Sequence, residues 1–322
     1  MPLGHRRPAL FTLIAIVLAL GALAGVSSVA GFESVGRVFA STHLDWLAAC
    51  AITQVVAYAG YVVAYRSVAR MQQGPSLGLS LTTLLVVAGF GGFAIGGGFA
   101  IDRRALHAVC RDRRDATVRV IGLGVVEYAI LAPVAAAAAV VLLLTGARTP
   151  ESLTLPWAIG VPVGFAVAFW IAAPARGPIP RPGSGRLREG FEHLLEGLGV
   201  LHRLVAEPFR HPGAWIGTAL YWSAEIACLY AALRTFGAHV PLAALIIAYA
   251  TGYAASKRSL PLGGAGVTEA LMAFALTWVG VPLAPALGGV VIYRGFNFLL
   301  PLVPALVAHT KLKPLLERAV HD

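Results

Sequence analysis

The chain consists of long runs of apolar residues separated by short connections that carry arginine, glycine and proline. A run that crosses the ~30 Å hydrocarbon core of a bilayer must satisfy its own backbone hydrogen bonds, which favours helices over open strands. The pattern therefore predicts an all-α polytopic membrane protein. We expect about eight transmembrane helices, over residues 9–31, 44–65, 118–145, 153–175, 214–236, 241–255, 261–279 and 284–308.

A ninth apolar stretch, residues 77–101, differs from the others in its glycine content. Its second half reads GFGGFAIGGGFAID, and each glycine costs a helix up to about 1 kcal/mol relative to alanine. A straight spanning helix is therefore disfavoured. We interpret the stretch as a glycine-broken or re-entrant segment, which at membrane depth must be covered by protein or line a wet cavity.

The distribution of lysine and arginine agrees with this interpretation, because positive residues favour the cytoplasmic side. We assume that the N-terminus is cytoplasmic and that residues 77–101 enter the membrane from the cytoplasm and return to it. Then 21 lysines and arginines are cytoplasmic, and Arg294 lies within a span. A spanning segment would instead export the arginine cluster 103–119. We predict a bacterial inner-membrane protein with both termini cytoplasmic. Only three positive residues then lie outside: Arg37, Arg148 and Arg234.

Composition narrows the function further. Hydrophobic residues make up 58 % of the chain and charged residues 12 %, far from a soluble average. The net charge of +10 comes from arginines beside the spans, so it indicates anionic lipid headgroups rather than nucleic acid. The three cysteines show no metal-ligand spacing and are expected to be free thiols. We expect no metal, no cofactor and no enzymatic motif.

The chain reads as one integral membrane domain in two halves. The halves are residues 1–175 and 213–310, followed by a short cytoplasmic tail, 311–322. Between them, residues 176–212 hold a proline-glycine linker and an amphipathic helix, which lies on the inner leaflet or packs on a partner helix. The apolar face of this helix consists of Leu187, Phe191, Leu194, Leu198, Leu201 and Val205.

Two similar motifs suggest a two-fold internal repeat. Each reads Gly-Gly, four residues and an acid, with a charged residue 25 positions beyond the acid. Corresponding glycine-broken segments are typical of transporters built from repeats, and chance similarity is the alternative. The expected topology places both Gly-Gly turns near the cytoplasm, whereas an inverted repeat needs them on opposite sides. The motifs are Gly96, Gly97, Asp102 and Glu127, and Gly263, Gly264, Glu269 and Arg294.

The second motif belongs to a longer run, LPLGGAGVTEALMAFALTWVGVPLAPALGGVVIYRGFNFLLP. With its Gly-Gly, its glutamate, its Gly-x-Pro turn and Arg294, this run resembles the signature of the lysylphosphatidylglycerol synthase transmembrane family. The earlier GGGFAIDRRAL is similar to that family's first-half motif. The resemblance covers roughly residues 44–306. It implies a lipid flippase like the flippase half of the bacterial multiple peptide resistance factor, without lysyl transfer, since no aminoacyltransferase domain is expected.

Ionisable residues inside spans are the main candidates for function. Each costs ~2.5 to 3.5 kcal/mol at a helix centre unless it is paired or hydrated. Arg294 is the sole deep cation, and Asn297 lies on the same helix face. The guanidinium suits a glutamate, as a structural ion pair, or a lipid phosphate, and an ion pair that opens would serve both. The acids within spans are Glu127, Glu225 and Glu269. Of these, Glu269 lies on the span adjacent to that of Arg294, and we predict that the two form one site with the Gly-Gly break before Glu269.

The Gly-Gly segment before Glu269 has two interpretations. It permits close helix packing, as does the motif at residues 213–217, or it breaks the helix so that free N–H groups attract an anion. On another span, Gln54, Tyr58 and Tyr61 share one face and either line a polar path or, for the tyrosines, anchor the interface or bond within the core.

The leading hypothesis is a flippase for a phosphate-bearing lipid: a phospholipid, an aminoacyl-phospholipid or a polyprenyl-phosphate conjugate. Two alternatives stay open. One is an intramembrane enzyme acting on such a lipid, and the other is an accessory subunit of cell-envelope synthesis. The expected partners are an anionic or phosphate-bearing membrane lipid and, in addition, a second copy of the chain or an envelope-synthesis protein.

Overall fold

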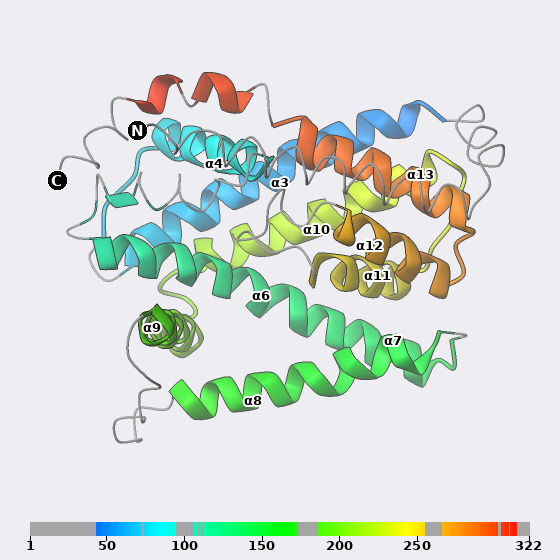
Figure 1. The fold of residues 1–322 in the computed structure, drawn as a ribbon, viewed down its shortest axis with the longest axis horizontal. Helices are drawn as coiled ribbons and strands as arrows, with labels where there is room; N and C mark the ends of the chain where they lie inside the picture. Colours follow the sequence, from blue (N-terminus) through cyan, green and yellow to red (C-terminus); the bar gives the residue numbers. More distant parts are fainter. Residues whose placement is uncertain are drawn as a thin grey trace, which may run out of the picture.

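The computed structural model describes residues 43–71, 74–94, 113–147, 149–172, 186–254, 266–301, 304–308 and 310–313, and in addition residues 103, 106, 107 and 110. Every regular element within these residues is helical, as the apolar pattern predicted (Figure 1). The expected span over residues 9–31 lies outside them. The elements are α3 (Asp45–Ala69), α4 (Leu79–Ala94), α6 (Arg113–Leu144), α7 (Glu151–Leu155), η2 (Pro156–Gly160), α8 (Val161–Ala172), α9 (Arg186–Ala206), α10 (Pro212–Arg234), α11 (Leu242–Ala254), α12 (Val267–Trp278), α13 (Leu283–Arg294) and η4 (Gly295–Leu299).

Four helical segments among the described residues are long and apolar enough to cross a bilayer. They are α3, α6, α10 and the continuous run of α7, η2 and α8, and they overlap four of the predicted spans. The run is interrupted by the π-helix η2, which begins at Pro156, and a proline has no N–H with which to continue an α-helical ladder. The chain is thus a multi-pass membrane protein, and the total of eight spans stays a prediction.

The helices α3 and α10 form an antiparallel pair, and α10 is the most buried of the four. At one end of the pair, the His43 N–H donates to the α10 C-cap carbonyl at 2.9 Å. Toward the opposite end, Gly60 and Gly217 bring the two backbones into contact, because a Cβ on Gly217 would lie 2.4 Å from the Ala64 nitrogen. The packing motif predicted at residues 213–217 is therefore confirmed.

Arginines gather at the other end of this pair, which we call the arginine end. The Arg119 guanidinium donates to the Ala69 and Met71 carbonyls at 2.7 Å each, so α6 begins beside the end of α3. Because α10 is antiparallel to α3, it begins there too. The chain therefore leaves α3 and enters α6 at the same end of the bundle, which is the arrangement that a re-entrant segment over residues 77–101 requires.

The helices α11 and α12 are shorter than the spans expected for them. Their 13 and 12 residues correspond to ~20 Å and ~18 Å, less than the ~30 Å of a bilayer core. α12 begins only at Val267, because Gly266 adopts a φ of +88° that other residues rarely take. A straight helix over residues 261–279 is thus not formed. α11 follows α10 at the end of the bundle opposite the arginine end, which we call the far end. There Gly289 of α13 packs on Leu233 of α10.

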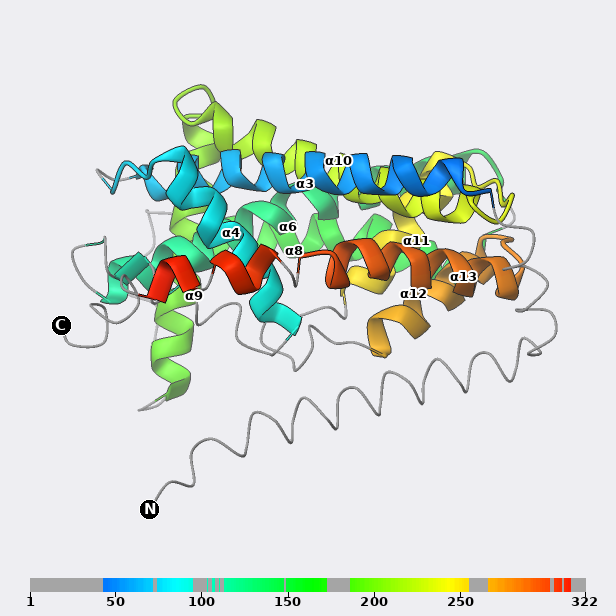
Figure 2. The same ribbon diagram turned by 90° about the horizontal axis from the view of Figure 1, so that it is seen from above.

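The helix α9 crosses the bundle at a steep angle. It is seen end on in Figure 1 and lengthwise in Figure 2, whereas α3, α6 and α10 run horizontally in both. Its buried face contains Gly197, Val200, Leu201 and Leu204. Val205, expected on the apolar face, is 46 % exposed. Around the helix, the buried residues are centred on one side of Leu201, and Val205 lies on its other side. The orientation suits an amphipathic helix in the plane of a membrane surface.

We predict that the arginine end faces the cytoplasm, because positive connections stay inside. In a background without Cys50, Cys110 and Cys228, an Arg210→Cys variant should resist an impermeant maleimide in intact cells. Arg210 is 71 % exposed, so it becomes reactive once the membrane is permeabilised. A Glu151→Cys variant, at the far end, should react without permeabilisation. The reverse pattern of labelling would contradict the orientation.

Candidate functional site

Arg294, the deep cation of the sequence, forms an ion pair with Glu269. Its Nε lies 2.5 Å from Glu269 Oε1, and both side chains are 13 % exposed. Arg294 ends the 12 residues of α13, which starts at the far end. The pair therefore lies ~18 Å along that helix, a length that compares with the ~30 Å of a whole bilayer core. It joins α12 to α13, as an ion pair that holds helices together should.

Glu269 also caps its own helix. The Gly266 N–H donates to Glu269 Oε2 at 2.5 Å at the start of α12, which is the half of a capping box that the N3 carboxylate supplies; glycine has no side chain for the other half. α12 thus begins directly after Gly266, and the N–H group exposed there receives an anion from within the chain. The break predicted at Gly263 and Gly264 lies outside the described residues. Glu269 lies between a guanidinium and the positive end of a helix dipole.

Glu225, in the middle of α10, is fully buried among neutral hydrogen-bond donors. Tyr293 donates its hydroxyl at 2.6 Å, and Gln54 donates its amide at 2.8 Å. Asn297 donates its amide nitrogen to both carboxyl oxygens at 2.9 Å. A carboxylate in a membrane interior is costly unless its oxygens are bonded. Donors from α3, α13 and η4 meet this requirement.

Asn297 connects Glu225 to the ion pair. Its side-chain oxygen Oδ1 accepts a hydrogen bond from Arg294 Nη1 at 3.3 Å, while its side-chain nitrogen Nδ2 donates to Glu225. The amide dipole is therefore oriented favourably toward both charges. The predicted common face of Arg294 and Asn297 is confirmed. We call the connected group the membrane polar cluster, and it consists of Gln54, Glu225, Glu269, Tyr293, Arg294 and Asn297.

The backbone beside this cluster departs from an α-helix. Directly after Arg294, residues Gly295–Leu299 form the π-helix η4, and such turns occur frequently at functional sites. The backbone carbonyl of Asn297 accepts a hydrogen bond from the Tyr58 hydroxyl of α3 at 3.1 Å. Contact with α3 thus holds the turn that presents the Asn297 side chain.

Glu127, a further predicted site residue, has different surroundings. Its side chain is buried and accepts from the Tyr61 hydroxyl at 2.8 Å, and its backbone carbonyl accepts from Trp222 Nε1. It therefore faces α3 and α10 from α6. Tyr58 and Tyr61 make hydrogen bonds inside the protein, so their core role is confirmed over interfacial anchoring.

The structure identifies one cluster residue that the sequence did not. Tyr293 was overlooked because a tyrosine in an apolar run is usually read as an interfacial residue or as packing. Its position directly before Arg294 was the available signal. Tyr249 extends the group, with its hydroxyl 3.2 Å from that of Tyr293.

The remaining predicted site residues lie outside the described part of the chain. Their roles at the site stay predictions, and so does the sequence repeat that they define. They are Gly96, Gly97, Asp102, Gly263 and Gly264.

Residues 12–305 match the family described as lysylphosphatidylglycerol synthase TM region. No curated protein matches the chain. The matched range contains all four candidate spans and the whole membrane polar cluster.

Proposed function

The chain belongs to the lysylphosphatidylglycerol synthase transmembrane family, and from this premise we propose that it moves a phosphate-bearing lipid between the leaflets of a bacterial inner membrane. The lipid is a phospholipid, an aminoacyl-phospholipid or a polyprenyl-phosphate conjugate. The observation that carries the proposal is the Arg294–Glu269 pair, which is 13 % exposed on both sides and connects through Asn297 to a second buried acid.

The headgroup crosses by replacing Glu269 as the anion at this position. Arg294 offers a planar guanidinium that binds phosphate oxygens, and the first turn of α12 offers backbone N–H groups and the positive end of its dipole. When Glu269 turns away, a phosphate can use both. The Asn297 and Tyr58 contacts hold η4, and with it Arg294, in place during the exchange.

The arrangement of the two halves supports a transport mechanism. α3 and α10, the first described helices of each half, are antiparallel. The segment containing α4 returns to the arginine end, while α11 and α12 lie toward the far end. We infer an inverted repeat, in which broken segments enter from opposite sides and a site forms between them. This would remove the conflict created by expecting both turns near the cytoplasm.

The proposal is tested by following a lipid between leaflets in proteoliposomes. With fluorescent phosphatidylglycerol in both leaflets, dithionite bleaches only outer probes, and the wild-type protein should make the inner probes accessible with time. An Asn297→Ala variant should slow this step, because the loss of a bond to a charged group costs about 1.5–3 kcal/mol. An Arg210→Gln variant serves as a control outside the cluster.

The same assay is repeated with lysylphosphatidylglycerol and with a fluorescent polyprenyl phosphate. Acceleration for at least one lipid, slowed by Asn297→Ala, supports translocation. If the folded wild-type protein accelerates none of the three above empty liposomes, the proposal fails.

A further inference from the structure

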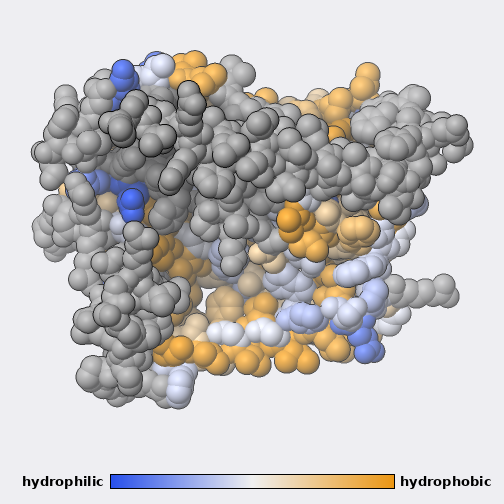
Figure 3. Space-filling model, in the orientation of Figure 1, coloured by the Kyte–Doolittle hydropathy of each residue, from blue (hydrophilic) through white to orange (hydrophobic). Residues whose placement is uncertain are grey.

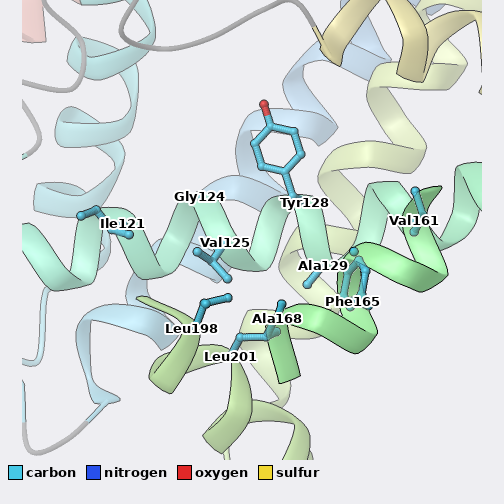
Figure 4. Close-up of a pocket in the computed structure, with 11 residues that line it drawn as sticks. Ile121, Gly124, Val125, Tyr128, Ala129, Val161, Phe165, Ala168, Leu198 and Leu201 are labelled. Atoms are coloured by element: carbon cyan, nitrogen blue, oxygen red, sulfur yellow. The ribbon is translucent and has the colours of Figure 1, made fainter. Parts of the chain in front are cut away.

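A groove of about 480 Å³ lies between α6, α8 and α9 and contains no residue of the membrane polar cluster. α6 and α8 meet near η2 and diverge toward α9, which closes the wide end (Figure 1). In Figure 4, Val125 and Ala129 of α6 face Ala168 of α8 and Leu198 and Leu201 of α9 across this space. The groove is therefore formed by hydrocarbon side chains from three helices.

The groove offers almost nothing to a polar molecule. Tyr128 carries the only hydroxyl among the lining residues, and Figure 4 shows its ring turned away from the others. The ring packs against Tyr253 of α11, with centroids 6.3 Å apart. A buried water needs two to four polar partners, so water does not fill such a space stably.

Two glycines keep the groove open. A Cβ added to Gly124 of α6 or to Gly164 of α8 would meet no protein atom within 4 Å. By contrast, a Cβ on Gly197 of α9 would lie 2.6 Å from Ile121, so that glycine brings two helices together. Gly124 and Gly164 therefore do not serve helix packing; they enlarge the space.

The groove faces the hydrocarbon of the membrane. In the span Glu151–Ile171, which contains α8, only 6 % of the most apolar window is buried inside the protein. Figure 3 shows α8 as a mostly hydrophobic band, separated from the rest of the molecule by an opening. If α9 lies along a membrane surface, the groove leads from that surface toward the bilayer interior.

We propose that this groove binds one acyl chain of a membrane lipid. An empty groove would forfeit the dispersion contacts of every side chain that lines it. The groove could enclose only roughly one turn of a helix about 10 Å across, so it is too small to hold a transmembrane helix. A flexible hydrocarbon chain fits the volume, the apolar lining and the access from the bilayer. This site is independent of the membrane polar cluster and of translocation.

The test uses vesicles of phosphatidylcholine in which one acyl chain carries a photoreactive diazirine. After reconstitution and irradiation, mass spectrometry locates the labelled residues. In the wild-type protein, labelling of the groove wall at Val125 and Ala168 should exceed that of Val163 and Val167, which are 56 % and 47 % exposed. This comparison needs no variant, so it does not depend on the folding of one.

A double variant, Gly124→Leu with Gly164→Leu, places side chains in the space at two positions where an added Cβ meets no protein atom within 4 Å. It should fold normally and lose groove labelling severalfold, whereas Gly160→Leu, also without a neighbour within 4 Å but outside the lining, should label as the wild type does. Equal labelling of groove and outer residues in the wild type would mean surrounding lipid only and would overturn the proposal. Unchanged groove labelling in a folded double variant, or a cross-link from the groove to residues 9–31, would also overturn it.

Discussion

An Arg294→Gln variant is expected to accumulate poorly in membranes and to melt at a much lower temperature than the wild type. The change leaves the largely buried Glu269 without its ion-pair partner, and the breaking of a buried pair costs about 3–5 kcal/mol. Abundance is measured by quantitative immunoblot of membranes, and stability by thermal unfolding in detergent. The matched control is Arg210→Gln, which breaks an exposed pair with Glu207 that contributes little to stability because water and salt screen it.

A second change separates folding from transport. Arg294→Gln combined with Glu269→Gln removes both charges, so abundance and thermal stability should recover. If Arg294 binds the lipid phosphate, translocation stays absent in this stable protein. Arg294→Lys should retain partial translocation, because a point charge replaces a planar fork. Full translocation by the stable double variant would remove Arg294 and Glu269 from the mechanism and leave them a structural role.

A Gly217→Leu variant is expected to lose most of the folded protein. A Cβ at this position would lie 2.4 Å from the Ala64 nitrogen and 2.6 Å from the Gly60 oxygen, both backbone atoms that cannot rotate away. α3 and α10 would have to separate, which would also pull Gln54 from Glu225. Overpacking costs typically 1–3 kcal/mol, and we expect about 3 kcal/mol or more here. Size-exclusion profiles of detergent extracts report the loss.

The control for this prediction is Gly199→Leu. It makes the same change in α9, where a Cβ would meet no atom within 4 Å. This variant should extract and melt as the wild type does, since leucine also favours a helix over glycine. A Gly217→Leu protein as abundant and stable as Gly199→Leu would show that the backbone contact between α3 and α10 does not hold the bundle together.

The apolar pattern alone was sufficient for the class of protein and for several local features. Long apolar runs require helices because a bilayer offers backbone groups no other partners. The common face of Arg294 and Asn297 follows from helical spacing, and the break before Glu269 follows from glycine's conformational freedom. The contact at Gly217 was also readable, because small residues four apart permit close helix approach.

The partners of the other buried acids were decided only by the tertiary structure. Glu269 was predicted to share a site with Arg294 because the two lie on adjacent spans, and the ion pair confirms that they meet. Glu225 received neutral donors instead, among them Gln54, which is 171 positions away. No local pattern encodes such a distance, because the contact depends on how α3 and α10 align along their glycines.

The lengths of α11 and α12 and the groove beside α8 were likewise set by the tertiary structure. Hydropathy reports the number of apolar residues but not where a helix begins, and Gly266 shortens α12 by adopting a φ of +88°. The glycines of the groove look like those of a packing motif in the sequence. The space beside a glycine is occupied by a neighbouring helix at position 217 and is open at positions 124 and 164. Which of the two occurs depends on the helix that approaches the glycine.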